Sequence, residues 1–363
     1  MSRYVPKFVV DKLLVDSTFG EETVEQAFDR LKITNPVLRK ILSYNYGDYG
    51  PAPNQSSYVQ HCMTVVHYAN GSSYPVNGPH VIAESVKNVV ERNGGKMLVN
   101  SKVKNIVIEN GAVKGVILEK NPNHLIKADR IISACGAYNT FVNLLTGEEH
   151  ELVRKAKQSF LDKEVGPSPC HCMVFAVFEG KEEDFNIPNA NIWVQDSPFD
   201  FPFVFISFPS TRDMNWKARH PNQVVCELIV ETDYETFANL SNEEYQKRKG
   251  ECADRMLKEL YRQFPRLENK MLFKVSSTPR TAERFLGSQH GCAYGVAATP
   301  SKFRANREWL RPTTPIKNLY LAGQDVVSCG LCGGMFGGLM AACCASSRCL
   351  MQARELIYPF SKL

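Results

Sequence analysis

One stretch of this chain combines residue types that can hold an extended polar or anionic ligand. Residues 318–345 read NLYLAGQDVVSCGLCGGMFGGLMAACCA, which predicts a short buried strand, a tight turn at Gly323, and a glycine-rich helix start. A helix start presents unpaired N–H groups and a positive dipole end, and glycines let a flat ring or a phosphate approach the backbone. Asp325, at the carboxyl end of the strand, is placed to accept hydrogen bonds from sugar-like hydroxyls.

Three other interpretations of this stretch are open. A membrane-spanning helix is one, because residues 326–347 carry no charge, but their few Leu, Ile and Phe side chains make insertion unfavourable. A helix of small residues that packs without a ligand is the second. Cys329 and Cys332 have the spacing of a redox or zinc pair, but a second pair at zinc-ribbon spacing is missing, so the sequence predicts no metal.

The composition is that of an ordinary globular enzyme. The chain has 363 residues, 44% hydrophobic and 22% charged, which suits two domains or one domain with an insertion. A net charge of +5 without a basic cluster does not point to nucleic acid, although it is compatible with peripheral contact with an anionic membrane surface. Twelve irregularly spaced cysteines predict free thiols in a reducing compartment.

The sequence ends on a tripeptide with a known cellular meaning. Ser361-Lys362-Leu363, at a free C-terminus, is a peroxisomal address read by an import receptor. A given tripeptide ends a random chain roughly once in several thousand cases, so the match is informative. We therefore expect the peroxisome as the location and its import receptor as a partner.

Periodicity and turn signals predict helices and strands before the ligand-binding stretch. Asn110-Gly111 is a strong hairpin turn between two alternating segments, and Gly94-Gly95 ends a helix. The expected segments are helices at 21–43, broken at Pro36, and at 79–93, and strands at 102–109, 113–119 and 127–134.

A second, antiparallel sheet is predicted in the middle of the chain. Its strands are followed by a charged amphipathic helix and then by mixed loops and short elements up to residue 317. The fold class is therefore α/β (α+β). The expected strands are 170–178, 191–195, 202–208 and 224–231, and the helix is 241–263.

The chain lacks the glycine loop of dinucleotide-binding folds. No two of its glycines are separated by a single residue, so G-x-G-x-x-G does not occur. Rossmann-type folds use that loop to hold the pyrophosphate. Because the other expected elements of such a fold are present, the sequence predicts a chain without its N-terminal βαβ unit, and loose dinucleotide binding as a result.

Four segments together support a resemblance to a known family. They are Gly47–Gly78, Phe205–Asn222, His290–Thr299 and Thr314–Gly330. With them the chain, from about residue 40 to 350, resembles the retinol saturase and phytoene desaturase group of FAD-dependent oxidoreductases, and within it the retinol saturases. One departure is Asn77-Gly78, where the group has Gly-Gly; Asn tolerates positive φ, so the turn can survive.

The resemblance implies a partial Rossmann-like FAD-binding domain with an inserted antiparallel-sheet substrate domain. The implied segments are 1–70 (helices and loop of the substrate domain), 71–150 (remaining part of the FAD-binding domain), 151–305 (antiparallel-sheet substrate domain) and 306–363 (C-terminal FAD-binding strand and helix, with the targeting tail).

The family pattern also implies particular FAD contacts. Val103 would lie on the strand that meets the adenine, although a plain core valine is the alternative, and for Asp325 the alternative is a helix N-cap. The implied contacts are Val103; Ser133, Ala134 and Gly136 at a strand end; Gly323, Gln324 and Asp325 at the ribityl and pyrophosphate groups; and Gly333, Gly334 and Met335 at the helix start.

The implied reaction saturates or desaturates a carbon–carbon double bond in a retinoid, carotenoid or related isoprenoid lipid, with NAD(P)H as a candidate electron donor. The flavin would carry the chemistry. His290 and Tyr294 are candidates for proton transfer or substrate positioning; a hydrogen-bonded structural pair is the alternative. Five aromatics could line an apolar tunnel or fill the sheet core: Phe199, Phe201, Phe203, Phe205 and Phe208.

Two other functions stay open at this point. One is a truncated, non-catalytic member that binds a lipid or a partner without holding FAD. The other is a peroxisomal amine oxidase of the same flavoprotein superfamily. The resemblance also implies the endoplasmic reticulum membrane as an alternative location.

Overall fold

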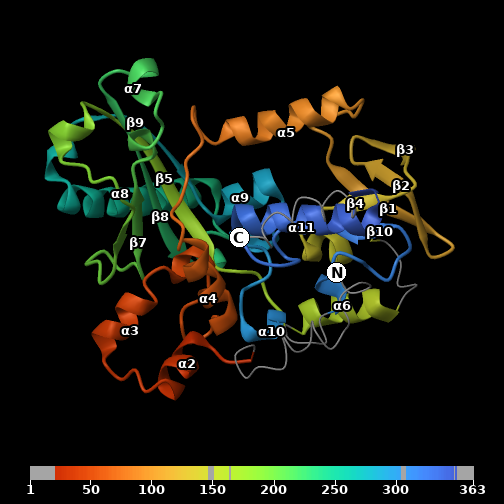
Figure 1. Ribbon diagram of the computed structural model, residues 1–363. Helices are drawn as coiled ribbons and strands as arrows, with labels where there is room; N and C mark the ends of the chain where they lie inside the picture. Colours follow the sequence, from red (N-terminus) through yellow and green to blue (C-terminus); the bar gives the residue numbers. More distant parts are fainter. Residues whose placement is uncertain (1–20, 146–150, 163–164, 304–307, 347, 350–363) are drawn as a thin grey trace, which may run out of the picture. The chain divides into compact units, whose positions relative to one another are not determined.

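Figure 1 shows the computed structural model, which describes residues 21–145, 151–162, 165–303, 308–346 and 348–349. Contacts divide the chain into two units, each assembled from separate segments. Unit 1 comprises the described residues of Met1–His67, Asn100–Ser168 and Gly287–Leu363, and unit 2 those of Tyr68–Val99 and Pro169–Leu286. The predicted domain segments stay a prediction; contacts group residues 68–99 with the antiparallel sheet.

Unit 1 contains two small sheets. One is an antiparallel meander in the order β1-β2-β3, and the other is a parallel pair of β4 and β10. Its strands are β1 (Val103–Glu109), β2 (Ala112–Leu118), β3 (Asn121–Lys127), β4 (Ile131–Ser133) and β10 (Leu319–Leu321), and its helices are α2 (Val24–Arg30), α3 (Pro36–Leu42), α4 (Tyr58–His67), the π-helix η3 (Asn139–Leu144), α6 (Glu151–Leu161), α10 (Pro300–Phe303) and α11 (Gly330–Ala345).

The predicted hairpin is confirmed, and its turn residues explain it. Asn110 and Gly111 have φ of 53° and 72°, the left-handed values that a two-residue hairpin turn requires. The predicted strand at 127–134 was wrong in extent, because the chain forms β3 before residue 127 and β4 only after residue 130. Asn121-Pro122-Asn123 gives β3 a start without the usual strand-forming residues, so the alternating pattern did not reveal it.

The N-terminal helices confirm the predicted break at Pro36. Pro36 opens α3, and the Asn35 side chain caps it by accepting from two backbone N–H groups, as expected of a proline at the first helical position. Phe28 of α2 is buried. Leu38 and Leu42 are 43% and 40% exposed, and α3 buries none of its residues.

Aromatic contacts fill the core of unit 1. The rings of Phe160 and Trp309 lie 5.1 Å apart, and Phe141 meets Trp309 edge-on at 6.1 Å. Leu319 and Leu321 of β10 are buried in the same cluster. The predicted buried strand before Gly323 is therefore confirmed, and it is anchored at the centre of its unit.

Unit 2 is a five-stranded antiparallel sheet in the order β6-β7-β8-β5-β9, packed against a long helix. The four predicted strands and the helix at 241–263 are confirmed, whereas β9 was missed. Its strands are β5 (Cys170–Glu179), β6 (Ile192–Val194), β7 (Val204–Ser207), β8 (Gln223–Thr232) and β9 (Met271–Ser277), and its helices are α5 (His80–Arg92), α7 (Trp216–Arg219), α8 (Asn242–Gln263) and α9 (Pro279–Leu286).

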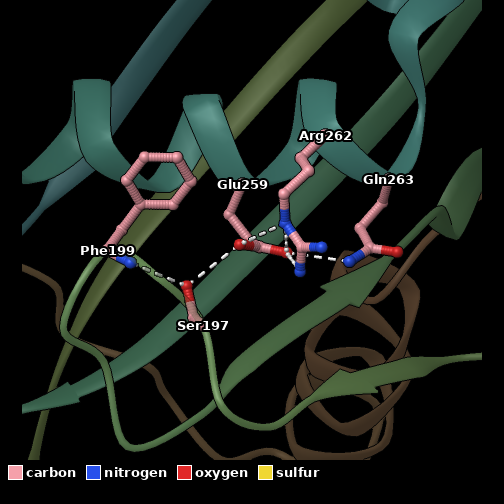
Figure 2. A network of polar contacts seen from close by, with 5 residues as sticks. All are labelled: Ser197, Phe199, Glu259, Arg262 and Gln263. Carbon is pink, nitrogen blue, oxygen red and sulfur yellow. Dashed lines mark hydrogen bonds and ion pairs between the residues drawn. The ribbon is translucent and has the colours of Figure 1, made fainter.

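A buried carboxylate joins α8 to the chain between β6 and β7. Glu259 is fully buried and accepts hydrogen bonds from Ser197, Arg262 and Gln263 at 2.6–3.1 Å (Figure 2). Burial alone would raise the pKa of this carboxyl, but the hydrogen bonds from its three partners hold the pKa below its ordinary value. A buried charge is tolerated here because it is paired and hydrogen-bonded.

Asn77 ties the segment before α5 to unit 2. Its φ of 75° confirms that asparagine adopts the left-handed backbone expected at this position. The Asn77 N–H donates to Asp213 at 2.9 Å, and its side-chain oxygen accepts from Asn215 at 3.0 Å.

In the described part of the chain, none of the helices is long and apolar enough to cross a membrane.

Candidate cofactor site

Two parallel strands end side by side in unit 1. Leu321 of β10 is in register with Ser133 of β4, and the Ala322 N–H donates to the Ser133 carbonyl at 2.8 Å. Each strand then turns at a glycine with left-handed φ, of 93° at Gly136 and 92° at Gly323. The carboxyl ends of parallel strands are where α/β folds bind ligands, so the structure brings both predicted turns to one place.

Asp325 holds three chain segments together. It is buried, and its Oδ2 and Oδ1 accept from the Ala137 and Val296 backbone N–H groups at 2.7 and 2.8 Å. The interpretation of Asp325 as a helix N-cap was wrong, because the residue at that position of α11 is Cys329. A carboxylate has about four acceptor sites, so the geometry leaves acceptor capacity for hydroxyl groups of a ligand.

A glycine that the sequence did not single out makes this arrangement fit. Gly295 has a φ of 65°, and a Cβ at this position would lie 2.1 Å from Asp325 Oδ1. Gly136 leaves 3.4 Å between the same carboxylate and the place of its missing Cβ. The carboxylate can therefore approach the backbone of residues 293–297 only because residue 295 lacks a side chain.

The glycines of α11 divide into two pairs with different surroundings. Added Cβ atoms at Gly333 and Gly337 would lie 1.7 Å from the Ser328 carbonyl oxygen and 2.3 Å from that of Gly323. At Gly334 and Gly338 the described residues place no atom within 4 Å. One pair thus seats the helix on the strand-end loop, while the other exposes its backbone along an open face, next to Met335, which is 64% exposed.

Gln324 closes the loop between strand and helix. Its Oε1 accepts from the Gly330 N–H at 3.1 Å, and its Nε2 donates to the Ala293 carbonyl at 3.5 Å. Ser328, in the same loop, hydrogen-bonds Gln60 of α4 at 3.0 Å. The Gln324 side chain therefore links the first residue of α11 to the loop at Ala293 by hydrogen bonds.

A buried lysine beside this loop gave no signal in the sequence. Lys302 of α10 is 6% exposed, and its Nζ lies 3.4 Å from the Gln324 carbonyl oxygen. Burial lowers the pKa of Lys302, and the Asp325 carboxylate acts in the opposite direction. A single lysine in the sequence TPSKF reads as a surface residue, and only the fold shows that it lies near the site.

The two catalytic candidates lie on the loop that leads to Gly295. The Tyr294 hydroxyl donates to the Gly47 carbonyl at 2.9 Å, and its N–H donates to Ser168 at 2.7 Å. His290 is exposed and has a left-handed φ of 51°. The structure thus gives Tyr294 a structural contact, and the proton-transfer roles of both residues stay predictions.

Val103 lies apart from the strand-end loops in the sheet topology. It opens β1, in register with Leu118 of the meander, and it is half-buried. Its predicted contact with adenine stays a prediction.

Among the described residues, no group of His, Cys, Asp or Glu side chains could hold a metal ion.

The residues present fit the ribityl and flavin parts of FAD. No atom of the described residues lies within 4 Å of an added Cβ at Gly334 or Gly338, so a flat ring could approach the α11 backbone there, and its two backbone hydrogen bonds leave the Asp325 carboxylate acceptor sites for hydroxyls. A parallel strand pair, a glycine-seated helix and a β-meander, accompanied by a separate antiparallel-sheet unit, form the two-part architecture that the sequence predicts for a flavin-binding fold.

Comparison with known proteins gives the family. The chain belongs to the flavin containing amine oxidoreductase family, which it matches over residues 16–350. A solved putrescine oxidase variant has a similar fold, with a TM-score of 0.61 and 12% identity over 92% of this chain and 68% of its own. An oxidoreductase from Methanosarcina mazei has a TM-score of 0.57 and 15% identity over 92% and 70%. The predicted fold class is confirmed.

Curated relatives confirm the predicted resemblance. All-trans-retinol 13,14-reductase of Rattus norvegicus is 27% identical over 336 residues, 85% of this chain and 55% of that protein. The Homo sapiens protein of the same name is 28% identical over 84% and 54%. A chloroplastic prolycopene isomerase of Daucus carota is 29% identical over 76% and 44%. The chain spans about half the length of the curated relatives that it matches.

Proposed function

We propose that this protein is an FAD-dependent oxidoreductase that saturates or desaturates a carbon–carbon double bond in a retinoid, carotenoid or related isoprenoid lipid. The observation that carries the proposal is the open face of α11 at Gly334 and Gly338, on a helix that follows the strand-end loop held by the Asp325 carboxylate. Family membership supports the flavin, and relatives named for retinol reduction and prolycopene isomerisation support the substrate class.

The chain's own residues would bind and orient the cofactor. FAD, when bound, supplies the hydride transfer. Gly334 and Gly338 would admit the ring to the α11 backbone, whose positive dipole end favours negative charge near the helix start. Asp325 would accept from ribityl hydroxyls while it keeps its two backbone partners. Lys302, buried next to the Gln324 carbonyl, would offset the negative charge of Asp325.

The activity test uses the full chain, FAD, and a polyene alcohol such as retinol. With NAD(P)H as the proposed donor, or with dithionite as a chemical one, we expect loss of polyene absorbance that depends on protein and FAD. Gly334→Leu is the matched variant, because it fills the open face without touching the Asp325 hydrogen bonds. Turnover that is equal in both proteins would contradict the proposed cofactor face.

Two results would favour the other functions. A folded chain that binds retinol but no FAD would indicate a non-catalytic lipid-binding member. Hydrogen peroxide release with polyamines, and none with polyenes, would indicate an amine oxidase.

We also propose peroxisomal import through Ser361–Leu363, which lie outside the described residues. Deletion of these three residues should turn a punctate fluorescent fusion diffuse. A punctate pattern without the tripeptide would contradict this proposal.

A further inference from the structure

The antiparallel sheet of unit 2 has two faces of different chemistry. Alternate residues of β8 point to the core against α8, among them Cys226, Leu228 and Val230. The residues between them, including Ile229 and Glu231, therefore point to the opposite face. We name this opposite side the second face.

The middle of the second face is apolar. Ile229 of β8 is in register with Met173 of β5 on one side and with Phe205 of β7 on the other. The Phe205 ring lies 4.9 Å from that of Trp193, and Phe175, two residues beyond Met173, is 39% exposed. A row of aromatic and aliphatic side chains across adjacent strands suits a long, flat apolar molecule.

One end of this row carries a polar pair. Glu231 is opposite His171 in the strand register, and each lies next to the last or first residue of its strand. The Oε2 atom of Glu231 is buried and has no hydrogen-bond partner among the described residues. A buried acceptor without a partner is costly unless a ligand supplies one.

Burial shifts the pKa of both groups toward the uncharged form. Burial, with a smaller effect of Asp233, raises the pKa of Glu231 to about 7. Burial lowers the pKa of His171 to about 4. A neutral acid and a neutral imidazole can exchange hydrogen bonds with an uncharged hydroxyl, which both donates and accepts.

We propose that Glu231 binds the hydroxyl end of an elongated apolar ligand that lies along the second face. The inference rests on the proposed function and narrows its substrate class to polyenes or isoprenoids with a terminal alcohol. An anionic end group would be repelled by the ionised form of Glu231. A cationic end group would require Glu231 to ionise in surroundings that disfavour the charge. The apolar row alone would bind an alcohol and a hydrocarbon of the same shape equally well. Glu231 distinguishes them, because only the alcohol can form a hydrogen bond with its carboxyl group.

Glu227 provides a matched control on the same strand. It lies on the same face four residues away, about 14 Å at the usual rise of a strand, in register with Phe175. Burial raises the pKa of Glu227 as well. Replacing it thus changes a similar carboxyl without touching the Glu231–His171 end.

The test measures binding alone and needs neither FAD nor turnover. Full-length chain is titrated with retinol and with the hydrocarbon in which a methyl group replaces the hydroxymethyl group, and polyene fluorescence gives both affinities. We expect a roughly tenfold preference for the alcohol, the worth of about one hydrogen bond, in the native chain and in Glu227→Leu. In Glu231→Leu the preference should fall close to one.

Each outcome supports or overturns the proposed role of Glu231, which we call the anchor. An unchanged preference for the alcohol in Glu231→Leu, or no preference in the native chain, overturns the anchor while the proposed function stands. If neither polyene binds the native chain, the proposed substrate class fails and the anchor fails with it. Thermal melts check folding, and Glu231→Met, with a side chain of nearly the same length, repeats the test if the leucine variant does not fold.

Discussion

The two glycine pairs of α11 lead to opposite predictions for the same substitution. In Gly337→Ala the new methyl group would lie 2.3 Å from the Gly323 carbonyl oxygen, so helix or loop must move. Overpacking of this kind costs about 1–3 kcal/mol, and the better helix propensity of alanine returns roughly 1 kcal/mol. We expect a net loss of up to about 2 kcal/mol in the free energy of unfolding.

Gly334→Ala lies three residues earlier in the same helix. Its methyl group meets no atom of the described residues within 4 Å, so only the gain in helix propensity remains, about 0.5–1 kcal/mol. The variant should therefore be more stable than the native chain in the absence of FAD. The same methyl group would stand on the face proposed for the flavin, so FAD affinity should fall.

The assay is thermal unfolding of the three proteins without and with FAD. At about 2–4 °C per kcal/mol for a domain of this size, the Tm of Gly337→Ala should fall by up to several degrees and that of Gly334→Ala should rise slightly. FAD should raise the Tm of the native chain more than that of Gly334→Ala. The reasoning is refuted if the two variants shift the Tm in the same direction, or if FAD stabilises Gly334→Ala as much as the native chain.

Three further predictions concern buried ionisable side chains. Glu259→Ala should lower the free energy of unfolding by about 2–4 kcal/mol, because it leaves Ser197 and Arg262 without their buried acceptor; a change below 0.5 kcal/mol in urea unfolding would contradict this. Burial raises the pKa of Glu231 from 4.5 to about 7, so the folded chain keeps a proton that the unfolded chain releases, and stability should fall as pH rises from about 5 to 8; Glu231→Gln should lose about 1–3 kcal/mol of that dependence, and equal pH profiles would count against it. Lys302→Met should weaken FAD binding while it leaves or raises the Tm, since it replaces a buried cation of similar length; unchanged FAD affinity would remove Lys302 from the site.

Local patterns predicted the elements, and the fold supplied the contacts between them. The hairpin at Asn110-Gly111 and the helix start at Pro36 follow from backbone preferences of a few residues, which the sequence states directly. β9 was missed because its residues, MLFKVSS, lie at a sheet edge and do not alternate cleanly. Strand pairing with β5, distant in sequence, decides its conformation.

At the candidate site, too, the sequence predicts the local elements but not the contacts between distant residues. The strand, the turn at Gly323 and the acid after it were predictable because their order is local. The partners of Asp325 come from residues 137 and 296, and the burial of Lys302 depends on how α10 packs. Likewise, alternation along β8 alone does not distinguish Glu231 from a solvent-exposed residue of an amphipathic strand.

The most direct test of the account is an FAD titration of the full chain followed by flavin absorbance and fluorescence, with Gly334→Leu as the paired variant. The account predicts saturable binding to the native chain, with a shifted flavin spectrum, and affinity at least tenfold weaker in the variant at an unchanged fold. A native chain that leaves the flavin spectrum unaltered, or a variant that binds FAD equally well, would contradict the claim that the open face of α11 holds the cofactor.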